Sequence, residues 1–132
     1  MSVDYGFDGL DELERQAYQV IERDFPAEFE KLVIQIAYEL QTKTKEKTPV
    51  RTGVLQDGWQ VGDVKKVDGE YVIEVFNNTE YAAEVEYGHR KRGGQGMVPG
   101  RHMMELSMQE VQARLDPFLR QWLHDFLDRQ EL

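Results

Sequence analysis

The chain has 132 residues, of which 40% are hydrophobic and 31% charged, so we expect one globular domain with a modest core. Its formal net charge of −9 argues against a dedicated nucleic-acid binder, because such proteins neutralise phosphates with an excess of Lys and Arg. The absence of cysteine excludes disulfides and thiolate chemistry, and no apolar run approaches the roughly 18 residues of a membrane span. The first residues lack the basic start and apolar run of a secretion signal, so synthesis and assembly in a cytoplasm are the simplest expectation.

Apolar residues spaced three and four apart predict a first helix over about residues 10–23. Asp8 or Asp11 could cap its N-terminus, where acidic side chains also suit the helix dipole. Pro26 lacks an amide donor, so this helix should end or kink near Asp24. Asp24 would then be the N-cap of a second helix that has Pro26 in its first turn.

A broad apolar stripe predicts the second helix. The step from Thr48 to Pro49 disfavours helical geometry at Thr48, so this helix should stop by about Lys47. The stripe consists of Phe29, Leu32, Val33, Ile36, Ala37 and Leu40.

After the second helix the apolar period changes to that of strands. Asp68-Gly69 is a strong two-residue hairpin turn because it tolerates positive φ, and the alternation around it predicts an antiparallel hairpin. Asn77-Asn78 predicts a second turn. Residues 81–87 are ambiguous between a helical turn followed by a strand and a strand throughout. In a strand, Glu84 and Glu86 would share one face.

Residues 89–100 lack an apolar period and contain four glycines and a proline, so we predict a mobile loop. A last helical region follows, with apolar residues from Met104 to Leu115 spaced near four. Asp116-Pro117 should interrupt it and start a C-terminal amphipathic helix over residues 116–132. The aromatic stripe of that segment could belong to the core or to a subunit interface. The order of helices, small antiparallel sheet and helices predicts an α+β fold.

Charge is distributed unevenly along the chain. Residues 1–30 hold nine acids against two arginines. Residues 89–101 hold no acid and four basic residues: Arg90, Lys91, Arg92 and Arg101. Two interpretations of this distribution stay open, which are solvated surface charge and head-to-tail electrostatic complementarity between neighbouring copies.

Groups that could act together in catalysis are missing from the sequence. The three histidines are scattered, and none has a second histidine at helical ligand spacing, so no metal site is predicted. The glycines at 93–96 are not followed by the Lys-Ser/Thr pair and helix of a phosphate-binding loop, and no Gly-x-Ser-x-Gly elbow is present. We therefore expect no catalytic residue, no cofactor and no enzymatic activity.

Several pieces of sequence, in order, carry a resemblance to one phage family. Thr48-Pro49-Val50-Arg51-Thr52-Gly53-Val54-Leu55 is followed by Gly58-Trp59, and Asn77-Asn78 precedes Tyr81-Ala82-Ala83-Glu84-Val85-Glu86-Tyr87-Gly88. A basic, glycine-containing loop then leads to Val98-Pro99-Gly100-Arg101-His102-Met103-Met104. This pattern resembles the Hong Kong 97-type phage tail-component proteins, a family of head–tail joining (tail-completion or neck) proteins. The resemblance covers about residues 27–115.

The resemblance implies a structural virion protein that forms a ring at the head–tail junction or tail end and is assembled in the bacterial host cytoplasm. Its partners would be copies of itself and neighbouring tail or connector proteins, with DNA contact secondary and no membrane. We expect one domain over residues 1–132, divided into an acidic N-terminal helix (1–25), a family-like core (26–115) and the C-terminal amphipathic helix (116–132). The candidate contact residues are Arg51, Tyr81, Glu86, Arg90, Lys91, Arg92 and Arg101.

The loop over residues 89–100 would order on binding a neighbour, with Gly88 and Gly100 as hinges. Two other functions remain open. A small nucleic-acid-contacting module could use the basic loop 89–101, with weak and salt-dependent binding. A small hydrolase from a mobile element would need an indispensable acid or histidine.

Overall fold

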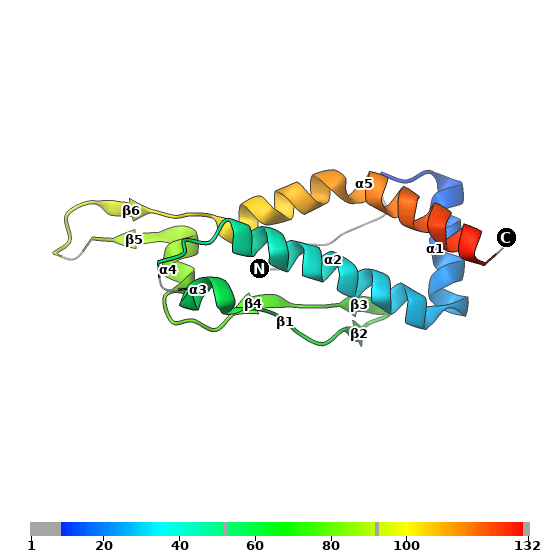
Figure 1. The fold of residues 1–132 in the computed structure, drawn as a ribbon, viewed down its shortest axis with the longest axis horizontal. Coiled ribbons are helices and arrows are strands. Elements are labelled where there is room, and N and C mark those ends of the chain that lie inside the picture. Colours follow the sequence, from blue (N-terminus) through cyan, green and yellow to red (C-terminus); the bar gives the residue numbers. More distant parts are fainter. Residues whose placement is uncertain (1–8, 52, 92, 131–132) are drawn as a thin grey trace.

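The computed structural model describes residues 9–51, 53–91 and 93–130 and has the predicted α+β architecture (Figure 1). The helices are α1 (Glu12–Asp24), α2 (Pro26–Glu46), α3 (Val54–Asp57), α4 (Ala82–Tyr87) and α5 (Met103–Arg129). The strands are β1 (Trp59–Val61), β2 (Lys65–Val67), β3 (Glu70–Val72), β4 (Val75–Asn77), β5 (Gly88–Arg90) and β6 (Met97–Pro99). The molecule is elongated: α1 lies at one end, the β5–β6 hairpin projects from the other, and α2 and α5 run between them (Figure 1).

Local signals set the boundaries of α1. Asp11 caps it, and a reciprocal capping box joins Asp11 and Glu14, which confirms one of the two predicted caps; Asp8 lies outside the described residues. The prediction that Asp24 caps α2 is wrong. Asp24 is the last residue of α1 and pairs with Arg23, because only Phe25 separates the two helices and serves as both C-cap and N-cap.

Helix α5 runs unbroken through Pro117, so the predicted interruption there is wrong. A proline inside a helix removes one hydrogen bond and bends the backbone, and the helix is bowed near its middle (Figure 1). Leu115 and Leu119 are both buried on either side of the proline. Their burial offsets the lost hydrogen bond and keeps the helix continuous.

Two hydrophobic clusters hold the helices together. The first core joins α1, the first half of α2 and the C-terminal half of α5, and it includes Leu119, Leu123 and Phe126. This burial assigns much of the aromatic C-terminal stripe to the core, with Trp122 stacked on Phe126 at 5.3 Å. The second core lies toward the hairpin end and contains Leu40, Leu55, Trp59, Ala82, Met103, Met104, Met108 and Val111.

Tyr18 ties α1 to α5 inside the first core. Its hydroxyl donates a hydrogen bond to the carbonyl oxygen of Leu119, and its ring stacks on Trp122. Burial raises the pKa of the Tyr18 phenol above its ordinary value, which keeps the hydroxyl protonated as the donor.

The strands form two-stranded antiparallel pairs. β1 pairs with β4 and β2 pairs with β3, so both belong to one interrupted ribbon that lies along α2 (Figure 1). Asp68 and Gly69 both have positive φ, which confirms the predicted hairpin turn. The ribbon is anchored at both ends, where Trp59 is buried in the second core and Tyr71 packs on Phe29 with ring centroids 5.1 Å apart.

Near the end of the molecule that carries β5 and β6, two segments differ from the structure predicted from the sequence. Residues 82–87 form α4, so Glu84 and Glu86 do not share a face: Glu84 is exposed and Glu86 is buried. The predicted loop over 89–100 contains β5 and β6, which pair antiparallel with Gly88 opposite Pro99 and Arg90 opposite Met97. We call residues 88–100 the basic hairpin. None of the helices in the described ranges combines the length and apolarity needed to cross a membrane.

Candidate interaction surface

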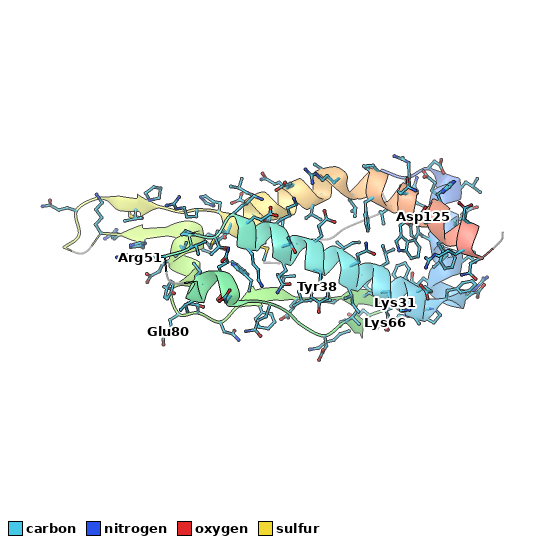
Figure 2. The ribbon with its side chains drawn as sticks, in the orientation of Figure 1. Lys31, Tyr38, Arg51, Lys66, Glu80 and Asp125 are labelled. Atoms are coloured by element: carbon cyan, nitrogen blue, oxygen red, sulfur yellow. The ribbon has the colours of Figure 1, made fainter. Side chains whose placement is uncertain are left out.

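The predicted contact residues gather at one end of the molecule. Arg51, Tyr81 and Arg101 flank α3, α4 and the start of α5, and Arg90 and Lys91 lie in the basic hairpin. Figure 2 shows Arg51 near the hairpin and Asp125 at the opposite end. All five of these side chains are exposed, whereas Glu86 is buried and Arg92 lies outside the described residues.

The cations at this end have no acidic partner within the described ranges. Arg51, Arg90, Lys91 and Arg101 form no ion pair with any residue that the structure describes. Two lysines at the end of α2 behave differently, since Lys43 and the C-cap residue Lys47 both pair with Glu110 of α5. The hydrogen bond from Lys47 holds the pKa of Glu110 below its usual range. The hairpin end therefore presents cations that form no ion pair within the described ranges.

The first and last residues of the segment from Thr48 to Trp59 stabilise the fold. Trp59 donates its indole N–H to the Thr48 hydroxyl at 2.9 Å, and that hydroxyl donates in turn to the Thr44 carbonyl at 2.7 Å. Gln41 on α2 donates to the Trp59 carbonyl at 2.8 Å. These bonds fix the end of α2 against β1. Since both Thr48 and Trp59 are buried, a neighbouring molecule would not reach them.

Asn77 closes the same corner from the other side. Its amide donates to the Leu55 carbonyl at 2.8 Å, and its side-chain oxygen accepts from the Thr79 amide at 2.9 Å. A Cβ atom on Gly58 would lie 2.8 Å from both the Asn77 oxygen and the Thr79 hydroxyl, so a larger residue there would displace these hydrogen-bonding side chains. At the predicted turn of Asn77-Asn78, Asn77 is the last residue of β4, and its side chain bonds to Leu55 of α3.

Glu86 is 5% exposed and caps the N-terminus of α5. Its two carboxylate oxygens accept from the amides of Met104 at 2.9 Å and Glu105 at 3.2 Å. A helix N-terminus has unsatisfied amides and a positive dipole end, and a carboxylate satisfies both. We therefore assign Glu86 to the support of α5 rather than to contact with a partner.

Replacing Glu86 with glutamine is expected to lower the free energy of unfolding by about 1.5–3 kcal/mol, because charge-assisted hydrogen bonds to two amides are lost or weakened. Urea denaturation measures this change. The matched control is Glu84→Gln on the same helix, which is exposed and should stay within about 0.5 kcal/mol of the unaltered protein. Equal effects for the two substitutions would contradict the capping role.

The base of the basic hairpin is closed by backbone contacts. Arg101 donates its amide to the Val85 carbonyl at 2.7 Å, and His102 donates to the Glu86 carbonyl at 3.0 Å. Gly88 has φ +89°, and a Cβ atom there would lie 2.5 Å from the Val98 carbonyl oxygen. A Cβ atom on Gly100 would clash with the backbone of Glu86 and Tyr87. The two glycines, expected as hinges, are explained by this close approach of two chain segments.

A shallow depression of about 660 Å³ lies between α4 and the basic hairpin. It is lined by Glu84, His89, Arg90, Lys91 and Val98, so one carboxylate faces two cations and an imidazole. The lining is mostly polar and exposed, which suits a surface contact better than enclosure of a small molecule.

One group of side chains has the composition of a cation site. The ligating atoms of Glu86, His102 and Glu105 lie within 4.8 Å of one another. The Glu86 oxygens already accept from the α5 amides, and His102 Nδ1 lies 3.0 Å from a Glu105 oxygen. Capping of α5 accounts for the position of Glu86, and a cation here would stand at the unfavourable positive end of the helix dipole.

Sequence reasoning missed the capping carboxylate and the paired strands of the basic hairpin. The hairpin left one signal, since glycines at positions 93, 94 and 96 all adopt positive φ and form its tip between β5 and β6. Glu86 left no local signal, because the amides it caps lie eighteen and nineteen residues away.

A comparison with known families gives one match over more than half of the chain. The family model described as "Bacteriophage HK97-gp10, putative tail-component" matches residues 11–88. The match includes α1, which the sequence resemblance left outside, and it ends where the basic hairpin begins. No curated protein and no solved structure matches the chain.

Proposed function

Because the chain belongs to the HK97-gp10 family of bacteriophage tail components, we propose that it is a non-catalytic virion assembly protein that forms a ring at the head–tail junction or tail end. It binds copies of itself and neighbouring tail or connector proteins, and assembly takes place in the bacterial host cytoplasm. The observation that carries this proposal is the projecting hairpin at one end of the molecule, whose cations Arg90 and Lys91 form no ion pair with a described residue.

Beyond its closely packed base at Gly88 and Gly100, the basic hairpin contributes little to the stability of the protomer. None of its described residues belongs to the buried set of either core, and its strands pair only with each other. A two-stranded hairpin in water is only marginally stable by itself. Retaining such a segment on the surface is best explained by a contact that it makes with another molecule.

An acidic protein surface suits this hairpin better than DNA does. The exposed cations are few and belong to a chain of net charge −9, so binding to phosphates would be weak and steeply dependent on salt. Contact with DNA inside a tail channel is therefore a secondary role. A gel shift at moderate salt that showed tight binding would reverse this order.

Deleting residues 93–96 should leave the protomer folded but reduce assembly of particles. The deletion removes the tip of the basic hairpin and leaves both cores intact. In a phage or prophage that lacks its own copy of the gene, complementation with the deletion variant should yield at least tenfold fewer infectious particles. Circular dichroism and the melting temperature establish that the variant is folded. A normal particle yield would overturn the role of the hairpin in assembly.

A matched pair of substitutions tests the charge of the basic hairpin without changing the length of the hairpin. Lys91→Ser removes an exposed cation of the basic hairpin, and Lys65→Ser removes an exposed cation of β2 in the long ribbon. Only Lys91→Ser should reduce the particle yield. Equal losses would mean that net charge, rather than this surface, limits assembly.

A further inference from the structure

We propose that the basic hairpin of one protomer binds the outer face of α1 in the next copy, so that ring contacts are head-to-tail between opposite ends of the molecule. This inference rests on the proposed ring-forming function and names the two surfaces that would meet. The two surfaces lie at opposite ends of the long axis (Figure 1). The α1 face of a protomer therefore cannot reach its own hairpin, whereas the α1 face of a second copy can.

The first surface is the hairpin patch, which consists of Tyr87, Arg90, Lys91 and Met97. Tyr87 and Met97 are both 60% exposed, and Met97 lies directly across the hairpin from Arg90. Apolar side chains beside an unpaired guanidinium and ammonium are typical of an interface centre with a charged rim. Since Met97 does not line the depression beside α4, it stays available to a partner.

The second surface is the outer face of α1. Leu13 and Val20 are seven residues apart and lie on one exposed side of the helix, turned away from the side on which Tyr18 and Ile21 are buried. Leu13 is 76% exposed and Val20 is 44% exposed. Because α1 already buries one apolar side, its fold does not require the exposed apolar side chains of Leu13 and Val20.

The charges at the two ends are complementary. Residues 11–31 hold seven acids and three bases. Glu14, Asp24 and Glu28 already form ion pairs, whereas Glu22 and Glu30 form none with a described residue. At the hairpin end, Arg90, Lys91 and Arg101 likewise form no ion pair with a described residue. Glu12 borders the outer face of α1 and forms no ion pair with any described residue. Among the described residues, its carboxylate accepts one side-chain hydrogen bond, from the Gln16 amide at 3.3 Å. Opposite charges at the rim would guide encounter and register, while the apolar side chains supply contact area.

The geometry of this contact also determines how copies can assemble. Different surfaces of the two protomers meet, so the contact is heterologous and produces a ring if the rotation closes. Each contact is small, with two exposed apolar side chains on either side. Its affinity should therefore be weak for a single pair and be raised by ring closure or by a template.

The test uses full-length protein at concentrations up to about a millimolar, with native mass spectrometry and sedimentation. Leu13→Asp destroys the α1 face and leaves the hairpin patch, while Met97→Asp does the reverse. Each variant alone should raise the dissociation constant for self-association at least tenfold. An equimolar mixture should form dimers that cannot extend, because one intact hairpin patch meets one intact α1 face. Higher salt should weaken the association of the unaltered protein.

The control is Tyr38→Asp, which alters an exposed aromatic residue on α2 outside both surfaces, and should associate like the unaltered protein (Figure 2). All three variants should have the same melting temperature. Undiminished association of Leu13→Asp and Met97→Asp, or no dimers in their mixture, would overturn the head-to-tail contact and leave the ring proposal standing. A protein that stays monomeric throughout would overturn this contact too, while the particle assay with the hairpin-tip deletion still tests the proposed function.

Discussion

Replacing Gly88 with alanine is expected to detach the basic hairpin from its base and to lower the free energy of unfolding by about 3 kcal/mol. Gly88 has φ +89° and ψ 170°, a region that residues with a Cβ atom almost never adopt. The added methyl would also lie 2.5 Å from the Val98 carbonyl oxygen and 2.8 Å from the Gly100 nitrogen. Backbone strain and steric overlap therefore add at one position.

Gly94→Ala is the matched control for this substitution. Gly94 also has positive φ, at +78°, but a Cβ atom there meets nothing within 4 Å. Its cost should be limited to about 1 kcal/mol of backbone strain. Urea denaturation gives the two stabilities, and hydrogen exchange of the Arg101 amide reports whether the base of the hairpin has opened. Similar losses at the two glycines would show that close packing at Gly88 is unimportant.

Replacing Trp59 with alanine should cost about 3–5 kcal/mol, the range for removing a large aromatic side chain from a core. Trp59 is 6% exposed within the second core, and its indole N–H is the donor to Thr48. The substitution removes packing between α2, β1 and α5 together with that hydrogen bond. Chemical denaturation followed by circular dichroism, rather than by tryptophan fluorescence, measures the change.

Thr48→Val separates the contribution of the hydrogen bonds from that of packing in the effect of Trp59→Ala. It keeps the volume of the side chain but removes both hydrogen bonds of the hydroxyl, so it should cost about 1–3 kcal/mol. A loss as large as that of Trp59→Ala would place the stabilisation in the polar bonds instead of the packing. A loss below about 1 kcal/mol for Trp59→Ala would contradict its assignment to the core.

The parts of the fold that were predictable from sequence depend on neighbours a few residues apart. The Asp11 cap acts on the amide of Glu14, and Pro26 and the Asp68-Gly69 turn restrict their own backbone. Persistence of α5 through Pro117 depends instead on contacts with distant helices, which local rules do not contain. In the sequence, Pro117 therefore indicated a helix boundary, although packing keeps α5 continuous through it.

The candidate surface was predictable in composition but not in arrangement. Arg51 and Arg90 could be selected as exposed cations, yet their placement at one end follows from the folding of α2 back along α5. The role of Glu86 was missed for the same reason. Its partners, the first amides of α5, become neighbours only once the basic hairpin has brought the chain back to α4.

The paired strands of the basic hairpin have a consequence for the thermodynamics of assembly. A loop of about a dozen residues that ordered only on binding would lose roughly 1–2 kcal/mol of conformational entropy per residue. In the hairpin, the cross-strand pairs from Gly88–Pro99 to Arg90–Met97 exist in the isolated protomer. Binding then immobilises mainly long side chains such as Arg90 and Lys91, at about 0.5–1.5 kcal/mol each. A preorganised segment can therefore form a small contact that a disordered one could not sustain.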